Sequence, residues 1–332
     1  MNKPKSGIFL LTALFITALA SGLALVTASQ EEGQITLRLP HSLDPEHVVH
    51  KSLLHFKQQV EALSNNQINI QIYTNGQLGS ERDQIELLQV GSLAMTKVSI
   101  SSMEAFVPEM QVFNLPYVFR DKTHYWQTLE SELGAELLDA PIDVGLKGLA
   151  YFDAGSRSFY TCNRAVQHPD DLSGLKIRTM KSQSAVKMTS AMGASATPIS
   201  FGELYTALQQ GVVDGAENNA ITLYKSRHYE ICKNYTLDEH NSIPDIIIIS
   251  QLVWQGLTPQ QQSWINQAMQ SAVSYQRALW KKDTELALEA LRAEGVNIIT
   301  PDKAPFMQRV SAFKSSFNGT EVGDLLERIE QL

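Results

Sequence analysis

The chain has 332 residues, of which 43% are apolar and 19% charged, a composition that is ordinary for a globular protein and sufficient for two domains with cores. Its formal net charge at pH 7 is −8, and an acidic chain gains no general attraction to nucleic acid or to anionic membranes. We therefore exclude nucleic acid as a partner, and any site for an anion must be built from local cationic groups.

The first residues have the pattern of a secretory signal. Lys3 and Lys5 precede an uncharged apolar run over residues 7–28, which ends in short side chains. We predict that residues 1–28 are a signal peptide cleaved after about Ala28, so that the chain is secreted. A retained membrane anchor is the alternative, because the run is about long enough to span a bilayer. Loss of the two lysines would leave 25 basic residues against 35 acidic ones, a net charge of −10.

Strands and helices alternate along the first half of the remaining chain. The strands show alternating apolar and polar residues, and the first helix carries an apolar stripe at helical spacing. Strands that alternate with helices favour parallel sheets. The predicted elements are the strands 35–39, 68–73 and 93–100, the helix 47–63, and a helix between Ser80 and Gly91.

The second half repeats this plan. The predicted elements are a strand at 176–180, a helix at 182–193, a helix from a capping box of Ser200 and Glu203 to Gly211, and a strand at Val212–Asp214. Residues 245–250, DIIIIS, form a continuous apolar run that is typical of a strand buried on both faces. A helix that begins at Thr258-Pro259 and runs as far as Glu294 would be up to about 55 Å long. We expect it to pack along both lobes of a two-lobed molecule.

Motifs of several enzyme classes are absent from the sequence. It holds no G-x-x-x-x-G-K-[ST] or G-x-G-x-x-G phosphate loop and no G-x-S-x-G nucleophile turn, and we predict no cofactor. His47 and His50 have a spacing that metal ligands can use, but a solvated helix face is the simpler interpretation, and we predict no metal site. Cys162 and Cys232 could pair in an oxidising compartment, although their spacing cannot show it.

Three polar stretches at the ends of predicted strands form the candidate site. Arg157 lies in DAGSRSFY and Arg178 in GLKIRTM. The stretch DGAENN supplies Glu217, Asn218 and Asn219. Ligands of parallel α/β sheets bind at the carboxyl ends of strands, and two guanidiniums with a carboxamide suit a carboxylate that has neighbouring hydroxyls. A surface or salt-bridged role is the alternative for either arginine taken alone.

Longer stretches of the sequence resemble a known family. They are GLKIR, GASATPISFGELYTALQQGVVDGAEN, HYEICKNYTLDEH, NGQLGSERDQIELLQVGSLAM and FNLPYVFRD. They resemble the extracytoplasmic solute-binding subunits of tripartite ATP-independent periplasmic (TRAP) transporters, over essentially all of the chain after the predicted signal. The resemblance implies an α/β fold of the two-lobed periplasmic-binding-protein type, with mainly parallel sheets in each lobe and a long helix that spans both. It implies a binding protein and not an enzyme.

The resemblance also implies how the chain is divided and what it meets. The first lobe would contain residues 29–154 and about 244–283, and the second lobe residues 155–243 and about 284–332. The implied partners are a small organic acid and the TRAP membrane permease subunits. We expect a monomer located in the periplasm.

Nine site residues are carried over from the family by position. Arg178 matches the arginine that clamps the ligand carboxylate, Arg157 matches a second arginine, and Asn218 an asparagine that contacts the same group. The remaining positions are Phe201, which would pack on the ligand, Glu81 and Asn219, which suit ligand hydroxyls, and His41, Ser99 and His240, which would line the site. Alternative roles are a helix-dipole partner for Glu81 and a core position for Phe201.

The resemblance leaves the ligand open within organic acids. AENN, HYE and DEH resemble members that take hexuronates such as glucuronate or galacturonate, which is our prediction. Ser99 replaces a glutamate of some sialic-acid binders, which counts against that ligand. A C4-dicarboxylate is the alternative and would need a second cationic site, which Lys97 and Arg82 could supply. A secreted enzyme acting on sugar acids is an alternative of another class, with Glu81 and Glu217 as its acid and base.

Overall fold

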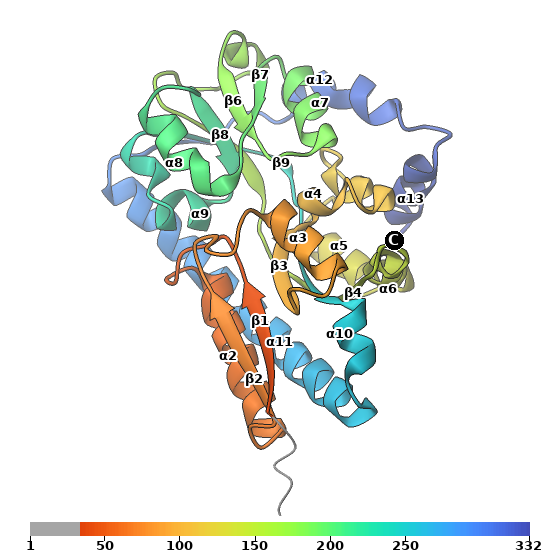
Figure 1. Ribbon diagram of the computed structural model, residues 1–332. Helices are drawn as coiled ribbons and strands as arrows, with labels where there is room; N and C mark the ends of the chain where they lie inside the picture. The colour runs from red at the N-terminus through yellow and green to blue at the C-terminus, as the bar shows by residue number, and fades with distance from the viewer. Residues whose placement is uncertain (1–33) are drawn as a thin grey trace, which may run out of the picture.

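Three sheets form the framework of the protein in a computed structural model that describes residues 34–332 (Figure 1). The predicted signal peptide lies outside the described residues. Within the described part of the chain, no helix combines the length and the apolar character that crossing a membrane requires.

Two sheets belong to the first lobe, in the lower part of Figure 1. β1 (Ile35–Pro40) pairs parallel with β2 (Ile68–Tyr73), and α2 (Val48–Leu63) connects them. β10 (Asp245–Ser250) lies between β3 (Met95–Ser99) and β4 (Leu146–Phe152) and pairs antiparallel with both. All six residues of β10 are buried, as the continuous apolar run predicted.

The second lobe is built on one sheet of six strands, in the order β11-β9-β5-β8-β6-β7. Three of its pairs are parallel, β6 with β7, β6 with β8, and β9 with β11, whereas β5 runs antiparallel to β8 and β9. The strands are β5 (Arg157–Thr161), β6 (Lys176–Thr179), β7 (Ser195–Pro198), β8 (Gly215–Asn218), β9 (Asn234–Asn241) and β11 (Asn297–Ile299).

The expected two-lobed α/β architecture is confirmed. Parallel pairs form where a helix connects successive strands, as α2 connects β1 and β2 and α7 connects β6 and β7. The antiparallel pairs all include β5 or β10, the strands that follow the crossings from β4 to β5 and from β9 to β10. β5 runs opposite to its neighbours β8 and β9, and β10 runs opposite to β3 and β4, so one of these sheets is mixed and the other is antiparallel.

The long helix α11 (Pro259–Ala293) spans both lobes, as the sequence predicted. Its capping box joins Thr258 and Gln261, with a proline in the first turn. It packs against α2 in the first lobe and α9 in the second, and its apolar stripe joins one continuous core with both. Each large side chain fully buried there, such as Ile265 or Leu291, contributes about 1.5–3 kcal/mol.

Shorter helices cover the sheets. Those of the first lobe and its connections are α3 (Glu81–Gln89), α4 (Ile100–Met103), η1 (Pro108–Asn114), α5 (Lys122–Leu129), α6 (Glu132–Asp139), η2 (Ala140–Val144) and α10 (Gln251–Gly256). Those of the second lobe are η3 (Pro169–Leu172), α7 (Gln183–Ala191), α8 (Phe201–Gln209), α9 (Ala220–Lys225), η4 (His228–Glu230) and α12 (Ala304–Ser315). The last helix of the chain is α13 (Glu321–Glu330).

Two local predictions were wrong. Ser200 precedes α8, but its side chain makes no capping hydrogen bond, so the expected capping box with Glu203 does not form. The strand expected at Val212–Asp214 begins instead at Gly215, because Val212 closes the turn after α8 through a hydrogen bond to the carbonyl of Ala207.

The lobe boundary near the end of the chain also differs from the expectation. Helix α12 packs on α7 of the second lobe. Helix α13, by contrast, packs on η1, and Leu325 and Ile329 join the apolar core around Phe113 and Tyr125 of the first lobe. The amphipathic face of α13 thus returns the chain to the lobe in which it began.

Cys162 and Cys232 form a disulfide across 70 residues of sequence. Cys162 directly follows the last residue of β5, and Cys232 lies just before the first residue of β9. The disulfide therefore links the two neighbouring strands at the same end of the sheet. The spacing alone left this pairing open, because only the antiparallel alignment of β5 and β9 brings the two ends together.

Candidate functional site

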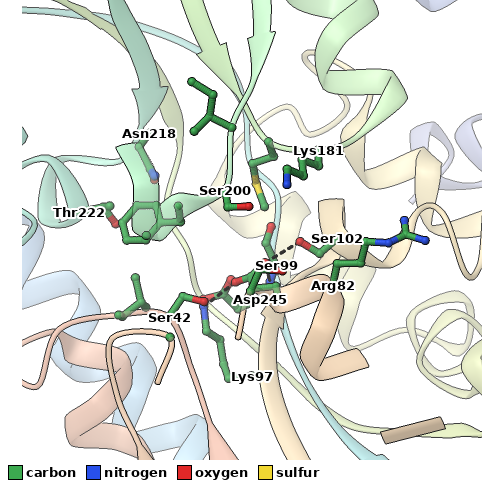
Figure 2. Close-up of a pocket in the computed structure, with 18 of the residues that line it drawn as sticks. Ser42, Arg82, Lys97, Ser99, Ser102, Lys181, Ser200, Asn218, Thr222 and Asp245 are labelled. Carbon is green, nitrogen blue, oxygen red and sulfur yellow. Dashed lines mark hydrogen bonds and ion pairs between the residues drawn. The ribbon is translucent and has the colours of Figure 1, made fainter. Parts of the chain in front are cut away.

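A cavity of about 490 Å³ lies between the two lobes, within the range of small-molecule sites (Figure 2). The second lobe contributes the ends of β6 and β8 and the loops that follow β6 and β7. The first lobe contributes the N-terminus of α3 and the ends of β3 and β10. Of the predicted site residues, the cavity is lined by Glu81, Ser99, Arg157, Arg178, Phe201, Asn218 and Asn219.

Arg178 is a buried cation without an acidic partner. Its side chain lies on β6 and is 2% exposed, and its Nε donates a 2.8 Å hydrogen bond to the Ile199 carbonyl. One Nη is buried without a hydrogen-bond partner, and no carboxylate of residues 34–332 forms an ion pair with this guanidinium. Burial lowers the pKa of Arg178, yet a guanidinium stays protonated in proteins. A buried charge left uncompensated is costly, so the position favours an anionic ligand.

Arg157 also reaches the cavity, but an acid already occupies most of its donors. Its Nε and one Nη donate to the carboxylate of Glu217, the latter at 2.8 Å, and the same Nη donates to the Glu217 carbonyl at 3.0 Å. The other Nη has no hydrogen-bond partner in the described part of the chain. Arg157 can therefore offer a ligand one edge of its guanidinium, whereas the bidentate fork faces Glu217.

A chain of alternating charges continues behind Arg157. His240 Nε2 lies 3.6 Å from the Glu217 carboxylate, and His240 Nδ1 lies 2.7 Å from the Asp238 carboxylate. Burial lowers the pKa of His240, but Asp238 and Glu217 outweigh it and raise the pKa to about 9. Burial raises the pKa of Glu217, but Arg157 and His240 outweigh it and bring the pKa to about 2. At neutral pH Arg157 and His240 are therefore cations and Glu217 is an anion.

The two asparagines after Glu217 have different roles. Asn218 Oδ1 accepts hydrogen bonds from the backbone N–H of Asn219 at 2.9 Å and from its side-chain amide at 3.1 Å. The Asn218 amide nitrogen is then left to donate toward the cavity, where Figure 2 shows this side chain pointing. Asn219 caps α9 through Thr222 N–H and donates to the Ala154 carbonyl at 3.0 Å. These hydrogen bonds fix the position of Asn219 between Asn218 and the start of α9.

The first lobe forms the opposite wall with a cluster of charges. Lys97 is 2% exposed, and its Nζ lies 2.9 Å from Asp245 Oδ2 and 3.9 Å from Glu81 Oε1. Glu81 Oε2 accepts hydrogen bonds from the Ser99 N–H at 3.3 Å and from the Ser102 hydroxyl. Burial raises the pKa of Asp245, and Lys97 opposes this shift. We call Glu81, Lys97 and Asp245 the floor cluster.

The comparison with family models decides what kind of protein carries this cavity. Residues 39–318 match the model described as bacterial extracellular solute-binding protein, family 7. The chain belongs to this family. Solved structures that are similar to this chain are TRAP periplasmic solute-binding proteins, so the resemblance read from the sequence is confirmed.

Three relatives illustrate the similarity. A TRAP periplasmic solute-binding protein of Xanthobacter autotrophicus Py2, with bound β-D-galacturonate, is 35% identical, has a TM-score of 0.86, and covers 89% of this chain and 99% of its own. One of Pseudomonas putida F1, with bound D-glucuronate, is also 35% identical, has a TM-score of 0.87, and covers 90% of this chain and 97% of its own. A C4-dicarboxylate-binding periplasmic protein of Rhodobacter capsulatus is 30% identical over 84% of each chain.

Two of the predicted residues of this solute-binding protein lie away from the cavity. His41 is buried, with Nδ1 accepting from the Leu43 N–H at 3.1 Å and Nε2 lying 3.0 Å from Nδ1 of His50. His240 is buried behind Glu217. Neither histidine lines the cavity, which corrects the expectation that both do. Burial, the largest cause, lowers the pKa of His41 to about 3, so this imidazole is neutral.

Other lining residues were missed by the sequence analysis. Trp280 extends from the middle of α11 and His47 from the start of α2, with ring centroids 5.8 Å apart. Little in the sequence indicates that these two residues line the cavity, because each occupies an ordinary position on a helix. Asp245 had a usable signal, since a lone acid directly before four buried isoleucines lies at a strand end.

The arrangement suits binding more than chemistry. It combines a buried unpaired guanidinium, an amide donor and a wall rich in hydroxyls and carboxylates, groups that are chemically complementary to an acid with hydroxyl groups. Within residues 34–332, no group of three or more metal-ligating side chains is placed to bind a metal ion.

Proposed function

We propose that this protein captures a small hydroxylated organic acid, best a hexuronate such as glucuronate or galacturonate, and delivers it to a TRAP membrane permease. Arg178 clamps the ligand carboxylate with its guanidinium. The single observation that supports this assignment is that Arg178 is buried at the cavity wall without any acidic partner. A bidentate carboxylate would satisfy both its charge and its unpaired Nη.

The neighbours of Arg178 complete the carboxylate site. The free amide of Asn218 and the remaining Nη of Arg157 donate to the same group, both from strands of the same sheet. Phe201, whose ring centroid lies 6.0 Å from the guanidinium carbon of Arg178, packs on the ligand ring. Glu81 and Ser99, on the opposite lobe, contact ligand hydroxyls. Binding between two lobes favours the closed state, because only that state provides all of these contacts at once.

The remaining parts of the proposal concern the setting. Residues 1–28 direct export, and the chain acts in the periplasm as a monomer. The closed, ligand-bound form is what the permease recognises. The uronates bound by the structures from Xanthobacter autotrophicus and Pseudomonas putida support this choice of ligand class.

The enzyme alternative lacks support at the residues that it requires. Glu217 was one of its two candidate acid–base groups, but this carboxylate is paired with Arg157 and does not line the cavity. A pKa of about 2 also makes Glu217 a poor proton donor and a weak base at neutral pH.

Calorimetric titration with D-glucuronate and D-galacturonate tests the proposal directly. We expect saturable binding by the wild type and a loss of about 2–5 kcal/mol in Arg178→Ala, as for a buried charge pair that loses one partner. Arg328→Ala, which removes an exposed arginine of α13, is the control and should bind as the wild type does. Near-normal binding by Arg178→Ala would contradict the clamp.

A thermal-shift panel of hexuronates, aldonates and C4-dicarboxylates tests the ligand class. A ligand at 100 times its Kd should add about 2.7 kcal/mol to the free energy of unfolding. No response to any organic acid would contradict the proposed function.

A further inference from the structure

The floor cluster places more acid than base on the first-lobe wall of the cavity. Glu81 and Asp245 carry two carboxylates against the single ammonium of Lys97, and all three side chains line the cavity. The cluster therefore has a formal charge of −1, whereas the second-lobe wall presents the unpaired Arg178. The floor cluster and Arg178 thus carry formal charges of opposite sign on the two walls, and Figure 2 shows Lys97 and Asp245 of the cluster.

Lys97 is not available as an anion site of its own. Its ammonium lies 2.9 Å from Asp245 and is nearly fully buried, with Glu81 at 3.9 Å on the other side. A second ligand carboxylate would have to take Lys97 from Asp245, which would leave a buried carboxylate without its counter-charge. Arg82, the other cation considered for this purpose, lies at the edge of the cavity, but it pairs with Glu86 at 3.0 Å and its side chain is 56% exposed, so it is a solvated charge that is already paired.

The same cluster is well suited to hydroxyl groups. Lys97 keeps N–H donors beyond the one that Asp245 uses, and Asp245 Oδ1 has no hydrogen-bond partner among the described residues. Ser99 and Ser102 lie beside Glu81. A ligand hydroxyl can donate to a carboxylate and accept from Lys97 without bringing any charge into the site.

We infer that the floor cluster makes this protein selective for acids with one carboxylate and a polyhydroxyl tail, and that it rejects acids with a carboxylate at both ends. This inference rests on the proposed function, since it assumes that Arg178 binds the first carboxylate. It identifies Asp245, which the sequence analysis did not name, as the residue that determines selectivity by keeping Lys97 paired.

Three acids of one carbon skeleton test the inference by calorimetry. D-galacturonate and D-galactonate have one carboxylate, whereas galactarate has one at each end. We expect galactarate to bind at least about 100-fold more weakly than D-galacturonate, because like charges brought together at a buried site are strongly unfavourable. D-galactonate shares the open chain of galactarate and should lie between the two.

Asp245→Asn is the decisive variant. Removing its charge makes the floor cluster neutral and frees Lys97, so the preference for D-galacturonate over galactarate should fall by about tenfold or more. Glu289→Gln, which removes an exposed acid of α11 outside the cavity, is the control and should keep the wild-type preference. If Asp245→Asn does not fold, Glu81→Gln makes the same change of charge at a more exposed position.

The outcomes separate the inference from the proposed function. Equal binding of galactarate and D-galacturonate, an unchanged preference in a folded Asp245→Asn, or equally weak binding of D-galactonate and galactarate would overturn the inference while leaving an acid receptor in place. The last result would assign the selectivity to ligand shape. Failure of every acid to bind the wild type would overturn both.

Discussion

Arg157 on β5 forms a bidentate ion pair with Glu217 on β8, and His240 and Asp238 extend the pair away from the cavity. Because the guanidinium is fixed by Glu217 before any ligand arrives, Arg157 loses little side-chain entropy when it donates to a carboxylate. The pair also leaves the cavity with Arg178 as its buried unpaired guanidinium.

Glu217→Gln tests this positioning role. The amide would keep the shape of Glu217 but leave Arg157 as a second uncompensated cation beside Arg178. We expect a lower free energy of unfolding without ligand, by about 3–5 kcal/mol, as for a buried pair that loses one partner. Chemical unfolding without ligand measures this loss of stability, and unfolding with D-glucuronate measures how much of the stability the ligand restores. Equal stability of variant and wild type would contradict the assignment.

Arg178→Lys separates charge from geometry. Lysine keeps the positive charge, but its ammonium cannot make a planar bidentate contact with a carboxylate. It also cannot hold the ligand while it donates to the Ile199 carbonyl, as Nε of Arg178 does. We expect uronate binding to weaken by about tenfold or more, although less than in Arg178→Ala. Calorimetry on the three proteins gives the order, and full retention of affinity in Arg178→Lys would show that a point charge is sufficient.

Asn218→Asp changes the second contact of the proposed carboxylate site. The donor amide would become a carboxylate beside the ligand's own carboxylate, so we expect a loss of affinity that grows as the pH rises from about 4 to 7, when the new acid ionises. Asn218→Ala is the matched variant and should show a smaller, pH-independent loss. Identical pH profiles for the two variants would contradict direct contact with the carboxylate.

The buried charges predict a window of maximal stability. The folded-state pKa of His240 is raised from 6.5 to about 9, so its contribution is complete below pH 6.5 and is lost as the pH rises through 9. The folded-state pKa of Glu217 is lowered from 4.5 to about 2, so its contribution is complete above pH 4.5 and is lost as the pH falls toward 2. Their joint maximum lies at about pH 4.5–6.5.

His240→Asn checks the alkaline side of this window. The wild type should lose stability between pH 6.5 and 9, on the order of 3 kcal/mol from this group, and the variant should lose less over the same range. Urea unfolding at a series of pH values measures the difference. Parallel pH curves for the two proteins would mean that His240 does not change its protonation on unfolding in this range.

Glu104 connects the lobes at a different place. This buried carboxylate at the end of α4 accepts from Ser184 N–H at 3.0 Å and from the Ser182 hydroxyl at the N-terminus of α7, and also from Asn114 at 3.0 Å. Glu104→Gln would turn an acceptor into a donor facing other donors. We expect the free energy of unfolding to fall by about 1–3 kcal/mol in urea, whereas Glu289→Gln, at an exposed position of α11, should leave it unchanged.

Much of the framework could be predicted from the sequence because it depends on local pattern. The apolar run of β10, the amphipathic stripe of α2 and the capping box of α11 each lie within a few residues, and the structure has these elements where they were expected. The predicted start of β8 was wrong because residues 212–214 belong to the turn that follows α8, where the Val212 N–H bonds to the Ala207 carbonyl. The strand therefore begins only at Gly215.

The family, the alternating helices and strands, and the presence of Arg157, Arg178 and Asn218 at strands of the second lobe could all be inferred from the amino-acid pattern. Which charged side chains are paired depends on how the strands come together in the folded protein. Glu217 lies 60 residues from Arg157 and Asp245 lies 148 residues from Lys97, and each pair meets across strands of a sheet. Burial stabilises these pairings, because a charge in the interior is costly without its counter-charge. Arg178 is buried without such a partner among the described residues, so its counter-charge must come from a ligand.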